Sequence, residues 1–218
     1  FHTYREWCKS WYRPNPNTRA IFQNVFLCRR DYPIGGTGYL MDAQTHRYTF
    51  PRLLEESRED LGGADLIDIS GWAYSEKYGR VGEYERYELG GLKNLQEGIA
   101  QSHSLGVPVG LYLEGYLIDP RSQIGRMHGK EWQIVDAQGK PKQWPGNEEM
   151  FICPSVPAWQ DFMSHTLLHV ARDTGADGVY MDEYGFADSG KTCFASQHGH
   201  LPGLHPVLSE HSMLQTVR

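Results

Sequence analysis

The stretch "DGVYMDEYGF", residues 177–186, decides the fold class, because a short apolar run ends there in two adjacent acids. Three earlier stretches have the same build: a short apolar run, a polar and glycine-rich loop, and then a helical pattern. They are "AIFQNVFLC" (20–28), "ADLIDISGW" (64–72) and "VPVGLYLEGYL" (107–117). This alternation of strands and helices predicts an α/β fold built on a parallel sheet.

Helices are predicted between and after these strands. Apolar residues recur at helical spacing in 90–105 and 157–174, and weaker patterns of the same kind cover about 51–61 and 206–218. Pro157 suits the first turn of a helix, and Gly175 suits its end.

Four strand–helix units are compatible with half of a TIM (β/α)8 barrel or with a small doubly wound sheet. A doubly wound sheet usually has a glycine-rich turn directly after its first strand, whereas "GGTG" at 35–38 comes several residues later. A complete barrel usually needs about 200 to 250 residues, and the four units take up the 218 residues here. We therefore predict an irregular lead-in at 1–20 and the first four units of a TIM barrel at 21–218, with the second half absent.

Composition and charge argue against some classes of binding partner. The formal net charge is -6 and no basic run is visible, which argues against nucleic acid or an anionic membrane as a partner. No apolar run approaches the roughly 20 residues needed to cross a bilayer. The four cysteines include no CxxC pair, and both disulfides and free thiols are compatible with their spacing. The cysteines do not settle the cellular compartment, and a secreted or periplasmic location is slightly favoured. The four residues are Cys8, Cys28, Cys153 and Cys193.

Strand alternation assigns the acids to faces of the sheet. Val179 and Met181 share a purely apolar face that should meet the helices, which puts Asp182 inside the barrel at the carboxyl end of its strand. By the same alternation Glu183 points away or lies in the loop. The inward positions of the two preceding strands are Asp68, Ser70, Gly110, Tyr112 and Glu114.

Three acids, Asp68, Glu114 and Asp182, are thus expected near the end of the sheet where barrel active sites lie. Asp68 is the deepest in its strand and the best candidate for a structural pair with an arginine. Trp72 follows the second strand and serves either as a sugar platform or as ordinary packing. Carboxylates in a cleft rich in Tyr and Trp suit glycoside hydrolysis, which uses two carboxyl groups.

A loop with Cys193, His198 and His200 follows the fourth strand. Its Cys-x4-His-x-His spacing matches no standard zinc site, so we expect no metal and no other cofactor. We expect the two histidines to hydrogen-bond substrate or backbone.

Three phrases carry a resemblance to a known family: "GVPVGLYLEGYLID", "CPSVPAWQDF" and "GADGVYMDEYG". They resemble the barrel domains of retaining glycoside hydrolases of the α-galactosidase and α-glucosidase type, and more closely the uncharacterised bacterial glycosidase-like barrels related to them. The resemblance covers about residues 64–190. It implies that Asp182 is the nucleophile and that the acid/base lies on a later strand, outside this chain. The best-known members of these families often have Lys or Trp shortly before the nucleophile, where this chain has Tyr180 and Met181. In some other barrel glycosidases the acid at the fourth strand is a Glu that acts as acid/base, and by that resemblance Glu183 would matter more.

The leading hypothesis is a glycoside hydrolase that acts on an oligosaccharide or glycoside by a retaining mechanism. The rest of the same polypeptide is needed to complete the barrel, so we do not expect this chain alone to have the complete active site. Asp182 is the catalytic residue. One alternative is a metal-dependent barrel hydrolase that uses Asp182, His198 and His200, and another is a non-catalytic carbohydrate-binding barrel. The predicted substrate-binding residues are Asp68, Trp72, Tyr112, Glu114, Glu183, His198 and His200.

Overall fold

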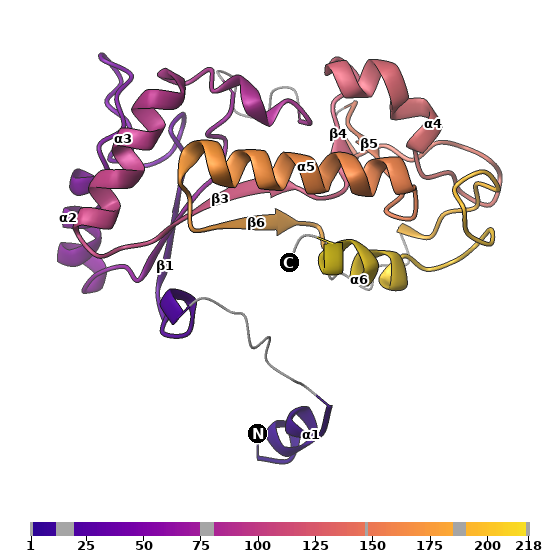
Figure 1. The fold of residues 1–218 in the computed structure, drawn as a ribbon, viewed down its shortest axis with the longest axis horizontal. Helices are drawn as coiled ribbons and strands as arrows, with labels where there is room; N and C mark the ends of the chain where they lie inside the picture. The colour runs from indigo at the N-terminus through magenta and orange to yellow at the C-terminus, as the bar shows by residue number, and fades with distance from the viewer. Residues whose placement is uncertain (1, 12–19, 75–80, 147, 185–190, 217–218) are drawn as a thin grey trace.

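A four-stranded parallel sheet forms the centre of the molecule. The computed structural model describes residues 2–11, 20–74, 81–146, 148–184 and 191–216. The strands lie in the order β1-β2-β3-β6 (Figure 1). Their bounds are Cys28–Asp31 for β1, Leu66–Ile69 for β2, Val109–Glu114 for β3 and Gly178–Asp182 for β6. The predicted α/β fold with a parallel sheet is confirmed.

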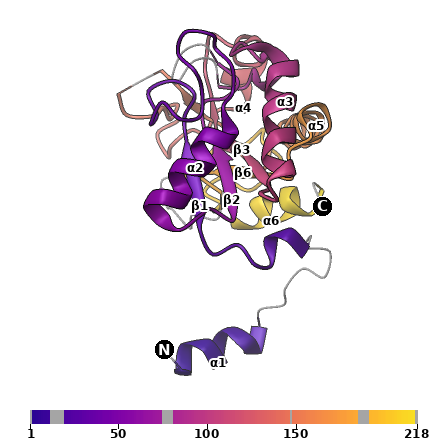
Figure 2. The ribbon, with the colours of Figure 1, turned by 90° about the vertical axis from the view of Figure 1, so that its left-hand side faces the viewer.

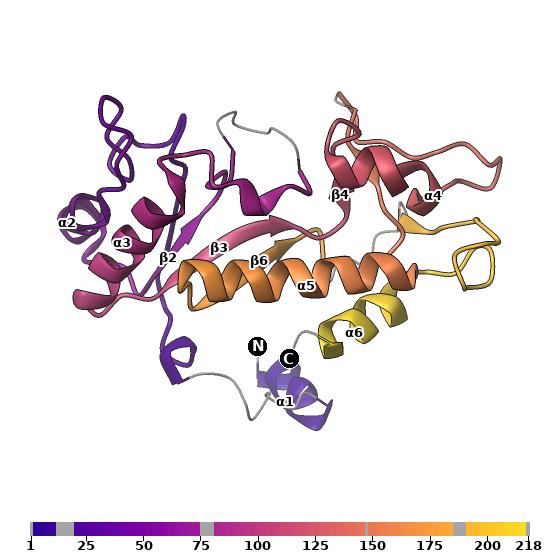
Figure 3. The ribbon, with the colours of Figure 1, turned by 45° about the horizontal axis from the view of Figure 1, so that its top comes forward.

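Three helices follow the first three strands and cover one face of the sheet. They are α2 (Phe50–Leu61), α3 (Gly91–Ser104) and α5 (Pro157–Thr174). In Figure 3, α3 and α5 lie in front of the strands, and α6 (Val207–Thr216) packs beside α5. The apolar side chains between these layers are fully buried, as strand alternation predicted: Ile67, Ile69, Val109, Leu111 and Leu113.

The helix ends follow from the local sequence. α2 and α5 each have a proline in the first turn, where the missing N–H costs no intrahelical bond. Each ends at a glycine in the left-handed conformation, Gly62 with φ 84° and Gly175 with φ 74°, which a residue with a Cβ adopts at a cost. The four predicted helices are therefore confirmed, with bounds close to those expected.

The first strand was placed too early in the chain. The apolar run 20–28 was expected to form it, but Ala20–Phe22 is a single 3-10 turn (η1) and β1 begins only at Cys28. The carboxylate of Asp65 accepts hydrogen bonds from the backbone N–H groups of Phe26 (2.9 Å) and Leu27 (2.8 Å), which occupies donors that a longer strand would use.

The charged residues that directly follow this apolar run, Arg29, Arg30 and Asp31, form the strand itself. Arg29 pairs with Glu56 at 2.8 Å, and Arg30 pairs with Asp68 at 2.6 Å. Because each guanidinium has a carboxylate partner, two arginines are tolerated in a four-residue parallel strand.

The lead-in segment was predicted to be irregular, but part of it is helical. Residues His2–Trp11 form helix α1, which lies apart from the sheet in Figure 2. The rings of Tyr4 and Trp7 are one helical turn apart, with centroids separated by 5.6 Å. The turn-rich phrase "RPNPN" at 13–17 lies outside the described residues.

The long insertion between β3 and α5, residues 115–156, lies at the carboxyl end of the sheet (Figure 1). It contains an antiparallel pair, β4 (Leu117–Ile118) with β5 (Met150–Phe151), a π-helical turn η3 (Gly125–Gly129) and the short helix α4 (Lys130–Trp132). A 3-10 turn, η2 (Tyr84–Arg86), follows β2. No helix in the described part of the chain is long and apolar enough to cross a membrane.

Candidate active site

The carboxyl ends of β3 and β6 bring two acids together. Glu114 and Asp182 are register partners in the parallel ladder, and so are Tyr112 and Tyr180 two residues earlier. All four side chains therefore project from the face of the sheet opposite the helices, as strand alternation predicted for them and for Asp68.

The hydroxyl of Tyr112 connects the two acids. It lies 2.6 Å from Oδ2 of Asp182 and also contacts Oε1 of Glu114 at short range. The other oxygen of Asp182, Oδ1, accepts the backbone N–H of Glu183 at 2.9 Å. Both oxygens of Asp182 thus have a donor, which fixes the orientation of this carboxyl group at the end of β6.

Glu114 is held in an environment that favours its neutral form. Burial, with Asp182 and other carboxylates nearby, raises the pKa of Glu114 to about 7, against the opposing hydrogen bond from Tyr112. Its Oε2 is buried and has no hydrogen-bond partner among the described residues. A buried carboxyl oxygen with no partner is costly unless a ligand completes it.

A cation lies next to the acids on the same face. The guanidinium of Arg30 donates to Asp68 at 2.6 Å and stacks 4.3 Å from the ring centre of Tyr180. Burial raises the pKa of Asp68, and the charge of Arg30 opposes that effect. Asp68 therefore forms the arginine pair that the sequence indicated as its structural alternative, while its Oδ1 is left without a partner in the described part of the chain.

The carboxylate of Glu183 has a different partner from that of its neighbour Asp182. Its backbone is in the left-handed region with φ 67°, uncommon for a residue other than glycine. Lys191, almost fully buried, pairs with the Glu183 carboxylate at 2.7 Å and donates to its backbone carbonyl at 2.6 Å. The two adjacent acids therefore have different surroundings, and Lys191 holds the turn that separates them.

Trp72 packs in the core, which corrects its predicted role as a sugar platform. Its side chain is 1% exposed, and its ring lies against Tyr84 and Tyr87 with centroids at 6.1 and 5.9 Å. Its indole N–H donates to the carbonyl of Tyr112 at 3.0 Å. Trp72 therefore supports the backbone of β3 beside the acids, and its faces are occupied.

The two histidines expected at the substrate lie in a cluster of their own. His198 contacts Cys193 and a backbone carbonyl, and His200 contacts Cys153 and another carbonyl. The predicted hydrogen bonds to backbone are thus present. The donor atoms that come together there do not include Asp182.

Two hollows adjoin the acids on the open face of the sheet. A small cavity of about 50 Å³ lies beside Glu114 and Ser70, whose Oγ is another buried atom without a partner in the described ranges. A wider hollow of about 660 Å³ extends toward the start of the strands and includes Phe22, Arg30 and Tyr180 in its wall.

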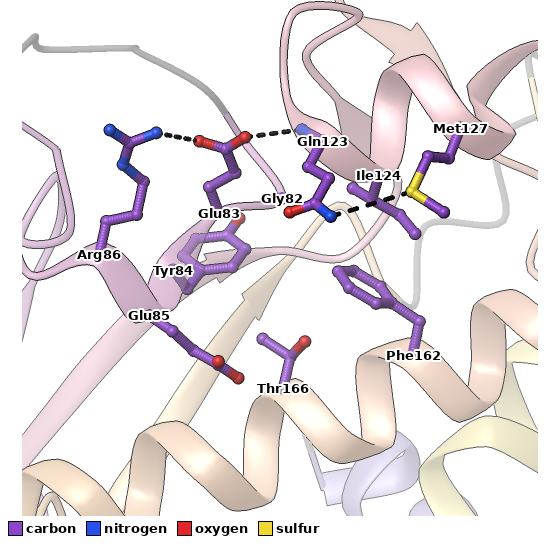
Figure 4. A pocket seen from close by; sticks show the side chains of 10 residues that line it. All are labelled: Gly82, Glu83, Tyr84, Glu85, Arg86, Gln123, Ile124, Met127, Phe162 and Thr166. Atoms are coloured by element: carbon purple, nitrogen blue, oxygen red, sulfur yellow. Dashed lines mark hydrogen bonds and ion pairs between the residues drawn. The ribbon is translucent and has the colours of Figure 1, made fainter.

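A third cavity, of about 420 Å³, lies among residues 82–86, the insertion and α5 (Figure 4). Glu83 spans its rim, because one oxygen contacts Arg86 at 2.7 Å and the other accepts the backbone N–H of Gln123 at 2.6 Å. Phe162 and Thr166 of α5 form its floor (Figure 4). This cavity is on the helical side and is separate from the acids.

Sequence reasoning missed Arg30 as part of the site. Arg30 follows the apolar run that was expected to form the first strand, and Cys28 and Arg30 have the spacing of one strand face. The missing signal was the ion pair with Asp68, which lies on the next strand and leaves no trace in the local pattern.

Comparison with known proteins finds a matching family model and a relative named as a glycoside hydrolase. The family model described as "Domain of unknown function (DUF6259)" matches residues 2–206. A protein of Bacteroides thetaiotaomicron named "Putative glycoside hydrolase" is 28% identical over 138 residues, which are 61% of this chain and 20% of that protein.

The solved structures that are similar support the same fold. The GH36 alpha-galactosidase AgaA from Geobacillus stearothermophilus is 16% identical with a TM-score of 0.61, over 91% of this chain and 27% of its own. The alpha-galactosidase TtGalA from Thermus thermophilus is 14% identical with a TM-score of 0.56, over 88% of this chain and 35% of its own. The chain thus spans well under half of these relatives, and the resemblance found in the sequence is confirmed.

Proposed function

We propose that this chain, which belongs to the DUF6259 family, is the first half of the barrel of a retaining glycoside hydrolase, with Asp182 as its nucleophile. The observation that carries the proposal is the Tyr112 hydroxyl between Glu114 and Asp182 at the carboxyl ends of adjacent strands. This is the end of a parallel α/β sheet where ligands bind.

The single proton of the Tyr112 hydroxyl assigns different states to the two acids. Tyr112 can donate to only one carboxyl group at a time, so the other must bring its own proton or repel the phenol oxygen. With its pKa raised to about 7, Glu114 is the group that keeps a proton. In this proposal the Tyr112 hydroxyl donates to Oδ2 of Asp182, and Asp182 is the carboxylate that acts as nucleophile.

The proposed reaction follows the retaining scheme. A carboxylate oxygen of Asp182 attacks the anomeric carbon, the bond from that carbon to the glycosidic oxygen breaks, and an acid on a later strand outside this chain protonates the leaving oxygen. Water, deprotonated by the same later residue, then releases the sugar and restores Asp182. The N–H of Glu183 and the hydroxyl of Tyr112 hold the attacking carboxylate in place.

The proposed sugar-binding atoms are the buried oxygens that lack partners in the described residues. They are Asp68 Oδ1, Ser70 Oγ and Glu114 Oε2, all on the face that carries Asp182. Sugar hydroxyls are both donors and acceptors, so a glycoside can satisfy carboxylate, carboxyl and hydroxyl groups together. Within the predicted set, Asp68, Tyr112 and Glu114 bind substrate in this proposal, while Glu183 positions the loop after β6.

The remaining strands of the barrel are proposed to come from the same polypeptide. Tyr180 is 44% exposed on what would be the inside of a closed barrel, and the hollow of about 660 Å³ beside it is lined largely by apolar atoms. Among the described strands, none pairs with the outer edge of β1 or of β6. Open edges of this kind need a cover, and four more strand–helix units would supply it.

The test uses the full-length protein that contains this chain. Purified protein is first screened on p-nitrophenyl glycosides, beginning with the α-galactoside because the similar structures are alpha-galactosidases. Asp182→Asn is expected to lower kcat by about 10³-fold or more, since no other group can form the covalent intermediate. Glu59→Gln, an exposed substitution on α2, is the control and should retain turnover.

Covalent trapping then identifies the nucleophile directly. A 2-deoxy-2-fluoro glycosyl fluoride of the active sugar should label the protein on the peptide that contains Asp182, and the label should be absent in Asp182→Asn. Undiminished turnover by Asp182→Asn would overturn the assignment. Sugar binding without turnover in the wild-type protein would favour the non-catalytic carbohydrate-binding barrel instead.

A further inference from the structure

Two cysteines and two histidines gather at one point outside the candidate active site. One ligand atom each of Cys153, Cys193, His198 and His200 lies within 4.8 Å of all the others. Cys153 follows β5, and the other three come from the loop between β6 and α6, so distant segments of the chain meet here. Three of the four side chains are nearly inaccessible: Cys153 and Cys193 are 2% exposed and His198 is 3% exposed.

Each imidazole presents one nitrogen to a sulfur. His198 Nδ1 lies 3.3 Å from the sulfur of Cys193, and His200 Nε2 lies 3.3 Å from the sulfur of Cys153. Around a tetrahedral zinc ion with bonds of about 2.0–2.3 Å, neighbouring donors are separated by about 3–4 Å. The two sulfur–nitrogen contacts fall within that range.

The remaining nitrogen of each ring fixes the tautomer. His198 Nε2 donates to the carbonyl of Glu131 at 2.7 Å, and His200 Nδ1 donates to the carbonyl of Leu201 at 2.8 Å. Because a carbonyl can only accept, these nitrogens carry the hydrogens, and in a neutral imidazole the other nitrogen presents its lone pair to the cluster. A backbone carbonyl behind the ring is the usual support of a metal-binding histidine.

We propose that Cys153, Cys193, His198 and His200 bind one zinc ion as a structural site. Two thiolates and two neutral imidazoles balance the charge of Zn²⁺ and complete a tetrahedron, which leaves no position for substrate or water. The soft sulfur donors favour zinc over magnesium or calcium, which bind oxygen ligands. The ion therefore has no part in hydrolysis, and the site differs from a catalytic metal centre that would use Asp182.

The ion joins the loop after β6 to the insertion. Of the backbone hydrogen bonds between them, one runs from Phe194 N–H to the carbonyl of Val135 at 3.0 Å. Cys193 lies two residues after Lys191, which holds Glu183 beside the end of β6. A metal at the cluster would thus anchor the segment that positions the turn next to Asp182.

Metal content of the full-length protein, purified without a histidine tag and under reducing conditions, tests the site. We expect zinc by elemental analysis, with stoichiometry lowered by one ion per chain in Cys153→Ser and in His198→Ala. Cys28→Ser is the matched control, because Cys28 lies on β1, outside the cluster, and this variant should keep the wild-type zinc content. Equal zinc content in wild type and Cys153→Ser would overturn the proposal.

A spectroscopic measurement on the wild-type protein remains decisive if these variants fail to fold. After zinc is exchanged for Co²⁺, we expect the intense visible bands of tetrahedral cobalt and a thiolate-to-cobalt charge-transfer band, both abolished by one equivalent of Zn²⁺. A weak octahedral spectrum would count against the site. So would a Cys153–Cys193 disulfide found by mass spectrometry in metal-free native protein, because the same two sulfurs cannot then bind the ion.

Discussion

Glu114 and Asp182 face each other across β3 and β6, and the hydroxyl of Tyr112 contacts a carboxyl oxygen of each. Burial disfavours the charged form of Glu114, and the nearby carboxylate of Asp182 adds to that cost. The pair therefore consists of Glu114, whose pKa is raised, and Asp182, whose two carboxyl oxygens accept hydrogen bonds from Tyr112 and from the backbone N–H of Glu183. This arrangement has consequences for stability, for pH dependence and for catalysis.

The first prediction concerns the pH dependence of stability. Folding raises the pKa of Glu114 from 4.5 to about 7, so between these values the folded state binds more protons than the unfolded state. The free energy of unfolding must then fall as pH rises through this window, by on the order of 2–3 kcal/mol for this group. Glu114→Gln keeps the shape and cannot ionise, so relative to wild type it should gain stability between pH 5 and pH 8.

Urea denaturation at pH 5, 6, 7 and 8 measures this difference. Glu59→Gln, an exposed substitution on α2, is the control and should shift stability by a constant small amount at each pH. A Glu114→Gln curve parallel to wild type across the window would contradict the raised pKa.

Strand alternation predicted which acids share a face, because side chains alternate strictly along a strand whatever surrounds it. Ile67, Val109 and Leu113 marked the helical face, and Asp68 and Asp182 followed on the other. The pattern failed at β1. There the charged pair Arg29 and Arg30 forms the strand, and its partners lie on α2 and β2.

The contacts within the site could not be predicted from the local sequence pattern either, because they join residues of different strands and loops. The Tyr112 hydroxyl meets Asp182 only because β3 and β6 pair in one register, and a shift of one residue would have separated them. Cys193, His198 and His200 were visible in one loop, but Cys153 belongs to another segment. The fourth donor appears only after the insertion and the loop pack together.

A second prediction tests whether Trp72 stabilises the core. Trp72→Ala should lower the free energy of unfolding by about 3–5 kcal/mol, because a fully buried ring would leave a cavity between Tyr84 and Tyr87. Trp144→Ala is the control, since Trp144 is 38% exposed in the insertion and should cost about 1 kcal/mol or less. Urea unfolding of both variants provides the comparison, and equal losses would show that Trp72 is not a core residue.

A third prediction concerns the buried ion pair. Arg30→Met leaves Asp68, 3% exposed, without its cation, and should cost about 2–3 kcal/mol at pH 8. Because Arg30 opposes the raised pKa of Asp68, its removal lets that carboxyl group take up a proton more readily, and the loss should be smaller at pH 5. Arg47→Met, which breaks the exposed pair with Glu97, should cost under about 1 kcal/mol at either pH. A loss for Arg30→Met that is independent of pH would argue that packing, not charge, holds this position.

The last prediction tests the hydroxyl between the acids. Tyr112→Phe keeps the ring stacked on Tyr180, with centroids 5.7 Å apart in the wild type, and removes the hydroxyl that contacts Asp182 and Glu114. In the full-length protein we expect kcat/KM on the active glycoside to fall by about 10²-fold, as it does when a preorganised donor is lost from an active site. Tyr180→Phe is the matched control, because its hydroxyl lies 3.5 Å from the same carboxylate, at the limit of a hydrogen bond, and its effect should be much smaller. If both variants retained kcat/KM within about twofold of wild type while Asp182→Asn was inactive, the nucleophile would stand but Tyr112 would have no part in orienting it.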